Sequence, residues 1–232
     1  MQSVELLVSD RMFGPSDCVQ IGAGDERWCS FYHHTSFARA TQEEFLAHAN
    51  EALSAARRFF ATCNKVVLTF GTAWCFRNVS TGAVVSNCLK RPASEFVRER
   101  LSASEVTSAL TRIADLCNGG SSYLQPKQFV FTVSPIRHFK DGAHGNQLSK
   151  AGLLLGIDSV IGDRAEYFPA YEIVMDELRD YRFYAEDMCH PTSQTTEYIL
   201  ERFLGWALPA DEKQVLEENI RRFRRSCHIE KL

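Results

Sequence analysis

The sequence of 232 residues has no long apolar run, and nowhere do the roughly 18 uncharged apolar residues of a minimal transmembrane helix follow one another. It therefore predicts no membrane span. The first residues, from Met1 to Asp10, also lack the basic start and the apolar stretch of a signal peptide. We expect a soluble, cytoplasmic protein.

A strong excess of positive charge is also absent. The chain has 26 basic and 29 acidic side chains, with an isoelectric point near 6.2. General nucleic-acid binding needs a basic surface that neutralises phosphates. The charge balance therefore argues against a nucleic-acid partner and favours a small or neutral one. The oligomeric state is not predicted.

Paired cysteine motifs are missing. None of the 8 cysteines lies in a C-x-x-C pair or at a metal-ligand spacing, and a chain of this length needs no disulfide framework. We expect reduced thiols and no metal. The adjacent His33 and His34 cannot easily share one ion, because neighbouring side chains in an extended segment point to opposite sides. We expect one of them packed under aromatic rings and the other lining a pocket.

Helix and strand patterns alternate along most of the chain. Thr41 and Glu44 form a capping box ahead of a helical apolar spacing that ends near residue 63. Residues 65–70 form an unalternating β-branched run, typical of a parallel strand buried on both faces, and residues 128–133 are expected as its parallel neighbour. The other expected elements are a hairpin over 76–87, a strand over 165–168 and helices over 92–100, 102–117, 147–155, 171–179, 195–207 and 209–227. This alternation predicts an α/β fold, and the length predicts one domain over 1–232, with 209–232 as a C-terminal helix.

The segment Tyr184-Ala185-Glu186-Asp187-Met188-Cys189-His190-Pro191 places a carboxylate and an imidazole three residues apart on a short loop. The carboxylate can accept a hydrogen bond from one ring nitrogen and so fix the tautomer. The other nitrogen is then free to take a proton from a hydroxyl. The alternative is that Asp187 caps a turn and His190 is a surface loop residue.

Several motifs resemble signatures of the GSCFA family, in the family's order, from about residue 4 to about residue 205. They are Trp28-x-Ser30-Phe31-x-His33-His34, Val67-Leu68-Thr69-Phe70-Gly71-Thr72-Ala73-Trp74, Asn87-Cys88-x-Lys90, Phe129-Val130-Phe131-Thr132-Val133-Ser134-Pro135-Ile136-Arg137-His138, Gly145-Asn146-Gln147-Leu148-Ser149-Lys150 and Tyr167-Phe168-Pro169-Ala170-Tyr171-Glu172. GSCFA proteins resemble the SGNH (GDSL-like) hydrolases. This implies a flavodoxin-like three-layer fold with a mostly parallel sheet, a serine nucleophile near the N-terminus and a late Asp-x-x-His pair. The resemblance thus implies that Asp187 and His190 are catalytic.

One departure from the family concerns the nucleophile. The Gly-Ser-Cys-Phe-Ala segment that names the family, expected on the first strand, is absent from this sequence. Residues 4–8 also have the pattern of the last turns of a helix, and a domain rarely opens on the tail of an element. We therefore expect a truncated chain that lacks its first strand and the nucleophile on that strand. Any targeting segment ahead of that strand would be missing as well.

The resemblance also implies an oxyanion-binding turn at the carboxyl end of the strand over 65–70, where ligands bind in open α/β sheets. Gly71 and its neighbours Thr72 and Trp74 are the candidates, and Asn87 is a candidate for an additional amide donor. A simple tight turn at Gly71 and a hairpin-end role for Asn87 remain alternatives.

Further pocket candidates follow the strand over 128–133. Ser134 is a poor nucleophile candidate, because Pro135 lacks the backbone N–H that the residue after a nucleophile donates. Arg137 and His138 are better candidates as pocket residues, with Arg137 binding a carboxylate or phosphate of the substrate. The alternative is an ion pair between Arg137 and Asp141 on a solvated loop.

Two functions remain open. The first is an SGNH-like serine hydrolase, an esterase or acylhydrolase that acts on a small-molecule, carbohydrate or lipid ester without a cofactor. This chain alone would be weak or inactive, because the serine is missing. The second is a non-catalytic binding or regulatory relative that keeps the pocket without the nucleophile.

Overall fold

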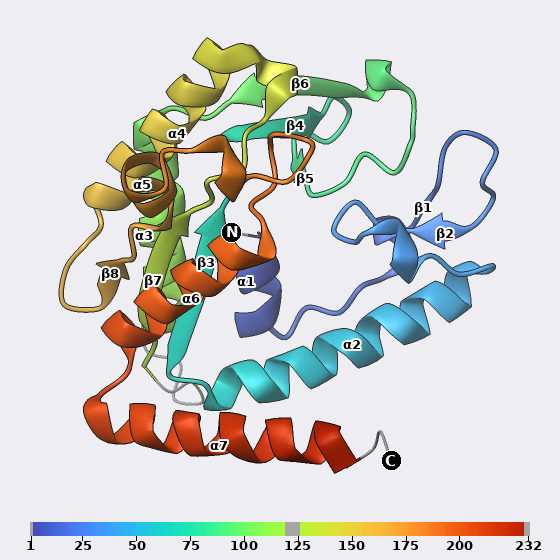
Figure 1. The fold of residues 1–232 in the computed structure, drawn as a ribbon. Coiled ribbons are helices and arrows are strands. Elements are labelled where there is room, and N and C mark those ends of the chain that lie inside the picture. The colour runs from blue at the N-terminus through green and yellow to red at the C-terminus, as the bar shows by residue number, and fades with distance from the viewer. Residues whose placement is uncertain (1, 119–125, 230–232) are drawn as a thin grey trace. The chain divides into compact units, whose positions relative to one another are not determined.

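The computed structural model describes residues 2–118 and 126–229, and the side chains up to residue 226 (Figure 1). Its internal contacts divide the chain into two compact units. The first unit is Met1–Ser134 with His138–Tyr167, and the second is Pro135–Arg137 with Phe168–Leu232. The count of one domain stays a prediction.

The first unit is built around a parallel sheet of three described strands, β3 (Lys65–Phe70), β7 (Gln128–Val133) and β8 (Ala165–Tyr167), in the order β3-β7-β8. Lys65 pairs with Gln128, and the register continues to the strand ends. This confirms that the strands over 65–70 and 128–133 are parallel neighbours. The chain therefore has an α/β fold with a parallel sheet.

The two strands differ in burial. In β7, the side chains from Phe129 to Val133 are buried. In β3, exposed and half-buried side chains alternate, and Val67 is 51% exposed. The expectation that residues 65–70 are buried on both faces is therefore wrong. Among the described strands, β3 lies at the edge of the sheet, so its hydrophobic run is covered less than that of the central strand.

Helices form the rest of the first unit's core. The α2 helix (Gln42–Thr62) begins at the predicted capping box, in which Thr41 Oγ1 accepts from the Glu44 N–H at 3.2 Å and Glu44 Oε2 accepts from the Thr41 N–H at 3.4 Å. The α3 helix (Ala103–Asn118) packs on α4 (Gly142–Asp158). A Cβ at Gly156 would lie 2.5 Å from Val106 Cγ1, so these helices approach as closely as only glycine permits.

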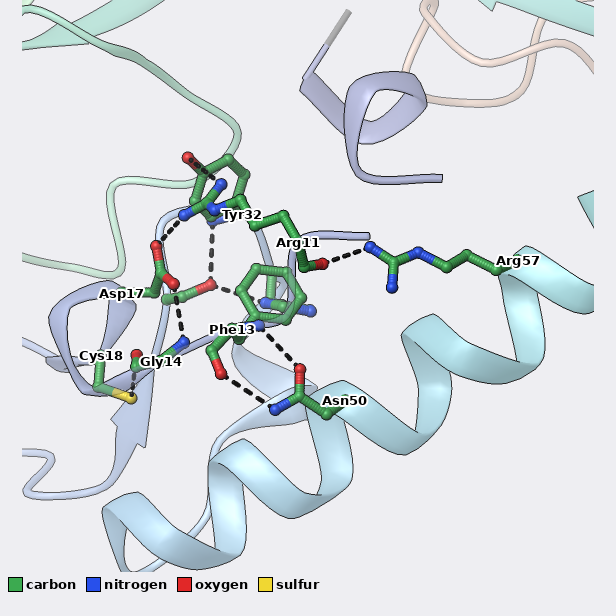
Figure 2. Close-up of polar contacts among 10 residues, drawn as sticks. Arg11, Phe13, Gly14, Asp17, Cys18, Tyr32, Asn50 and Arg57 are labelled. Carbon is green, nitrogen blue, oxygen red and sulfur yellow. Dashed lines mark hydrogen bonds and ion pairs between the residues drawn. The ribbon is translucent and has the colours of Figure 1, made fainter. Parts of the chain in front are cut away.

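The segment that follows α1 (Gln2–Val8) is tied to α2 by side-chain hydrogen bonds (Figure 2). The Asn50 amide accepts from the N–H of Phe13 at 2.8 Å and donates to its carbonyl at 3.0 Å. Arg57 donates to the carbonyls of Leu6 and Arg11. The segment from Leu6 to Phe13 is thus fixed against α2 by polar contacts as well as apolar packing.

An antiparallel sheet also belongs to the first unit. It contains β4 (Trp74–Asn78), β5 (Val84–Val85) and β6 (Phe96–Arg100) in the order β5-β4-β6, which confirms the hairpin over 76–87. The helix expected over 92–100 is wrong, because only Ala93–Glu95 form a 3-10 turn before β6. Pairing with β4 overrides the local helical pattern, and the Arg98 guanidinium lies 4.2 Å from the centre of the Trp74 ring. A short antiparallel pair, β1 (Val19–Gln20) with β2 (Trp28–Cys29), completes the described strands.

The second unit is mostly helical. It contains α5 (Ala170–Glu172), a π-helical turn (Ile173–Glu177), a 3-10 turn (Tyr181–Phe183), α6 (Ser193–Ala207) and α7 (Ala210–Ile229). The helix expected over 171–179 is only partly α-helical. The Leu178 N–H donates to the carbonyl of Ile173, five residues back, which is the π-helical pattern. The N-cap of α6 is Thr192, whose side chain accepts from the Thr195 N–H.

Candidate functional site

The loop over residues 184–191 closes on itself in the second unit. Tyr184 forms a β-bridge with Pro191, and the Ala185 N–H donates to the His190 carbonyl at 2.8 Å. The Asp187 Oδ1 accepts from the backbone N–H groups of Cys189 and His190, both at 2.9 Å. Asp187 therefore caps the turn.

The same carboxylate also binds the imidazole. Asp187 Oδ2 lies 2.5 Å from His190 Nδ1. This hydrogen bond is the main cause that lowers the pKa of Asp187 to about 2, and the two backbone N–H groups lower it further. At neutral pH the carboxylate is ionised, so Nδ1 carries a proton and donates it. Nε2 is then left to accept a proton, and it makes no hydrogen bond with the described residues of this unit.

Arg137 adjoins this loop within the second unit. The Cys189 thiol donates to the Arg137 carbonyl at 2.9 Å. The Arg137 guanidinium lies 4.7 Å from the centre of the Tyr184 ring and 5.7 Å from that of Tyr181. Asp141, the alternative partner of Arg137, pairs with Arg98 and is buried. Arg137 is therefore held by aromatic rings rather than by a carboxylate.

The turn at Gly71 lies in the first unit, at the carboxyl ends of β3 and β7. The buried Lys150 ammonium of α4 donates to the carbonyls of Gly71 at 2.5 Å and Ser134 at 2.6 Å. It thereby satisfies carbonyls at the ends of two neighbouring strands.

Ser149, also of α4, holds the next part of this turn. Its Oγ accepts from the Ala73 N–H at 2.7 Å and lies 3.0 Å from Thr72 Oγ1. The Trp74 N–H donates to Thr72 Oγ1 at 3.1 Å. The amides of Ala73 and Trp74 are thus already used, which leaves those of Gly71 and Thr72 as candidate donors to a ligand.

The His138 imidazole lies against this turn. A Cβ at Gly71 would lie 3.4 Å from His138 Nε2. That nitrogen is buried and has no hydrogen-bond partner in the described chain, and the same holds for the indole nitrogen of Trp74. Most buried polar atoms in proteins are paired. These two ring nitrogens therefore mark the turn as a place where a ligand or water would find partners.

Asn87 has a role in its own turn. Its Oδ1 accepts from the Leu89 N–H at 2.8 Å, where Leu89 and Lys90 have φ of 53° and 55°. The Lys90 carbonyl oxygen would lie 2.1 Å from a Cβ at Gly22, so the turn packs directly on a backbone that must be glycine. This geometry matches the hairpin-end alternative for Asn87.

The two adjacent histidines have different surroundings. His33 Nδ1 lies 2.7 Å from the buried Ser30 Oγ, and its ring lies 4.8 Å from Phe13 and 4.7 Å from Phe37. Burial lowers the pKa of His33. His34 is exposed, and its Nδ1 accepts from the Ser36 N–H as the N-cap of a 3-10 turn. His33 is therefore both packed under aromatic rings and part of the lining of an apolar cavity.

The motifs that carry these groups belong to one family. A family model described as the GSCFA family matches residues 1–203. The chain belongs to the GSCFA family. No curated protein and no solved structure matches it.

One GSCFA motif holds the Gly71 turn in place. In Gly145 to Lys150, the last two residues hold the Gly71 turn. A signal was present, because Lys150 shares the helical spacing of the buried Leu153 and Ile157, where an apolar residue is normal. A lysine at such a position indicates a buried partner.

Three further findings concern the described residues. They contain no group of three His, Cys, Asp or Glu side chains that could hold a metal ion. None of their helices combines the length and apolar character needed to cross a membrane. The seven cysteines whose side chains are described are free thiols.

Proposed function

We propose that this GSCFA protein is a hydrolase of the SGNH type, an esterase or acylhydrolase with a flavodoxin-like arrangement of its sheet and helices. The observation that carries the proposal is the 2.5 Å contact between Asp187 Oδ2 and His190 Nδ1. It gives the imidazole a fixed tautomer and a proton-accepting Nε2. Family membership and the parallel α/β sheet support it.

In this proposal, Nε2 of His190 takes the proton of an attacking hydroxyl. The oxygen of that hydroxyl bonds to the acyl carbon of the ester at the same time. Asp187 stabilises the imidazolium that forms. The imidazolium then returns the proton to the leaving alkoxide as the ester bond breaks. A water repeats both steps on the acyl intermediate and releases the acid.

Two further elements come from the resemblance. The turn at Gly71 is the proposed oxyanion-binding element, through the amides of Gly71 and Thr72. The proposed source of the attacking hydroxyl is the family's Gly-Ser-Cys-Phe-Ala segment, which this sequence lacks. By itself, the chain is expected to hydrolyse esters slowly, because His190 could then activate only water.

The test compares this chain with an extended chain in which a strand bearing Gly-Ser-Cys-Phe-Ala precedes residue 1. The extended chain is expected to hydrolyse an activated aryl ester and to form an acyl-enzyme that mass spectrometry detects. His190→Ala should abolish both, while the control His34→Ala removes an exposed histidine and should change neither. Turnover by the extended chain that survives His190→Ala contradicts the proposal.

The second candidate is a non-catalytic binding protein. A cavity of about 230 Å³ beside Arg137 favours it, because it offers a binding site that needs no nucleophile. This candidate predicts that the extended chain binds a ligand in the cavity but forms no acyl-enzyme.

A further inference from the structure

The cavity beside Arg137 lies wholly within the second unit. Val174 and Leu178, which are 1% and 7% exposed, provide buried apolar lining. The rings of Tyr181 and Tyr184 line it as well, and they also stack on the Arg137 guanidinium. With Met175, five of the eight lining residues are therefore apolar or aromatic, and the Arg137 guanidinium lies among them.

The charges of the lining are not balanced. Arg137 and Arg179 both line the cavity, and neither lies within ion-pair distance of a carboxylate of the described chain. Asp180 is the one acid among the lining residues described, and its carboxylate contacts Arg182 rather than Arg137 or Arg179. Its Oδ1 accepts from the Arg182 N–H at 2.9 Å, and its Oδ2 lies 3.6 Å from Arg182 Nε. The cavity thus has two guanidinium groups that no carboxylate of the described residues pairs with.

From this geometry we propose that the cavity binds a small ligand through a carboxylate or phosphate group held by Arg137. The Arg137 guanidinium is planar by delocalisation and lies beside both tyrosine rings, 4.7 and 5.7 Å from their centres. Its N–H donors therefore lie in one plane, which suits the two oxygens of such a group. A volume of about 230 Å³ equals that of roughly seven or eight waters at about 30 Å³ each. It accommodates a phosphate or a short acid.

The cavity is joined to the acid–base loop by two contacts. Arg137 accepts from the Cys189 thiol through its carbonyl, and Tyr184 is both a wall of the cavity and the first residue of the bridged loop. If the proposed function holds, the substrate is therefore an ester that carries an anionic group. Anion binding itself does not depend on the proposed function.

Calorimetry on the unmodified chain tests the binding, with phenyl phosphate and benzoate as probes and benzyl alcohol as their uncharged counterpart. At least one anion should bind with a single saturable site, and benzyl alcohol should not. Preference between the two anions identifies the group that the ligand carries. Arg137→Gln should weaken binding at least tenfold, because it removes charge-assisted hydrogen bonds. Arg222→Gln changes the net charge equally, on an exposed part of α7, and should leave binding unchanged.

A second variant is needed because Arg137→Gln could lose binding by misfolding. Arg179 is exposed, so Arg179→Gln should keep the fold and weaken binding several-fold. The proposal is overturned if neither anion saturates, or if Arg222→Gln weakens binding as much as Arg137→Gln. If the proposed function is wrong but the anion site is right, the anions bind and the extended chain forms no acyl-enzyme. If only the anion site is wrong, the extended chain hydrolyses neutral and anionic aryl esters equally well, and benzoate does not inhibit it.

Discussion

The loop at Asp187 and the turn at Gly71 are held in opposite ways. The hydrogen bonds of Asp187 reach no more than three residues along the chain, and its side chain is 49% exposed. The Gly71 turn is held by Ser149 and Lys150, whose hydrogen bonds span 76 and 79 residues and are formed by side chains that are 1% exposed. The loop at Asp187 is held by contacts between close neighbours on the surface, whereas the turn at Gly71 depends on packing within the first unit. Changes to the loop should therefore alter chemistry more than stability. Changes to Ser149 and Lys150, which hold the turn from α4, should mainly alter stability.

The largest expected effect is that of Asp187→Asn in the extended chain. The amide cannot accept from Nδ1–H in the way the carboxylate does, so the wrong tautomer is favoured and turnover should fall by about 10⁴-fold, as in serine proteases. The melting temperature should change little, since the Asn Oδ1 can still accept from the backbone of Cys189 and His190. A pH–rate profile beside a thermal melt checks both. A sharp drop in melting temperature with intact activity per folded molecule would mean that the carboxylate is only a turn cap.

Next in size is the loss of stability expected for Lys150→Met. The thioether has a similar shape but leaves the Gly71 and Ser134 carbonyls without this donor. An unsatisfied buried polar group costs about 1–3 kcal/mol, so we expect about 2–4 kcal/mol in urea unfolding. Lys65→Met is the control, because Lys65 is exposed at the start of β3 and should change stability by no more than about 0.5 kcal/mol. Equal effects of the two substitutions would contradict the role assigned to Lys150.

The contrast between contacts of close neighbours and contacts of distant residues also explains what the sequence could predict. The capping box of Thr41 and the pair of Asp187 with His190 depend on neighbours in the chain, and the spacing of the residues was enough to predict their contacts. Residues 92–100 were wrongly expected to be helical, because the pairing of β6 with β4 is decided far away in the sequence. The exposure of β3 and the binding of two carbonyls by Lys150 are equally non-local. The spacing within one segment can indicate that Lys150 is buried, but it does not encode which carbonyls Lys150 binds.

Two glycines allow a finer comparison within the first unit. A Cβ at Gly22 would lie 2.1 Å from the Lys90 carbonyl oxygen, whereas one at Gly71 would meet the His138 ring, with Nε2 at 3.4 Å and Cε1 at 4.0 Å. Gly22→Ala forces the backbone apart and should cost about 1–3 kcal/mol or more. Gly71→Ala should cost less than about 1 kcal/mol, yet lower turnover of the extended chain if the turn binds the oxyanion. Urea unfolding of both variants measures the difference. A larger loss for Gly71→Ala than for Gly22→Ala would contradict this geometry.

The smallest expected effect is the dependence of stability on pH that comes from Asp187. Its pKa is lowered from 3.8 to about 2, so the folded state binds this proton less readily than the unfolded state. The stabilisation is therefore complete above about pH 4 and is lost as the pH falls towards 2. The group is exposed and solvent and salt screen it, so the effect should be small and should shrink further in high salt. NMR titration of the carboxyl carbon should give a midpoint near 2, and Asp187→Asn should have a flatter stability curve in this pH range. A midpoint near 4 would show that the contact with His190 Nδ1 does not persist in solution, and the acid–base pair would then lack its fixed tautomer.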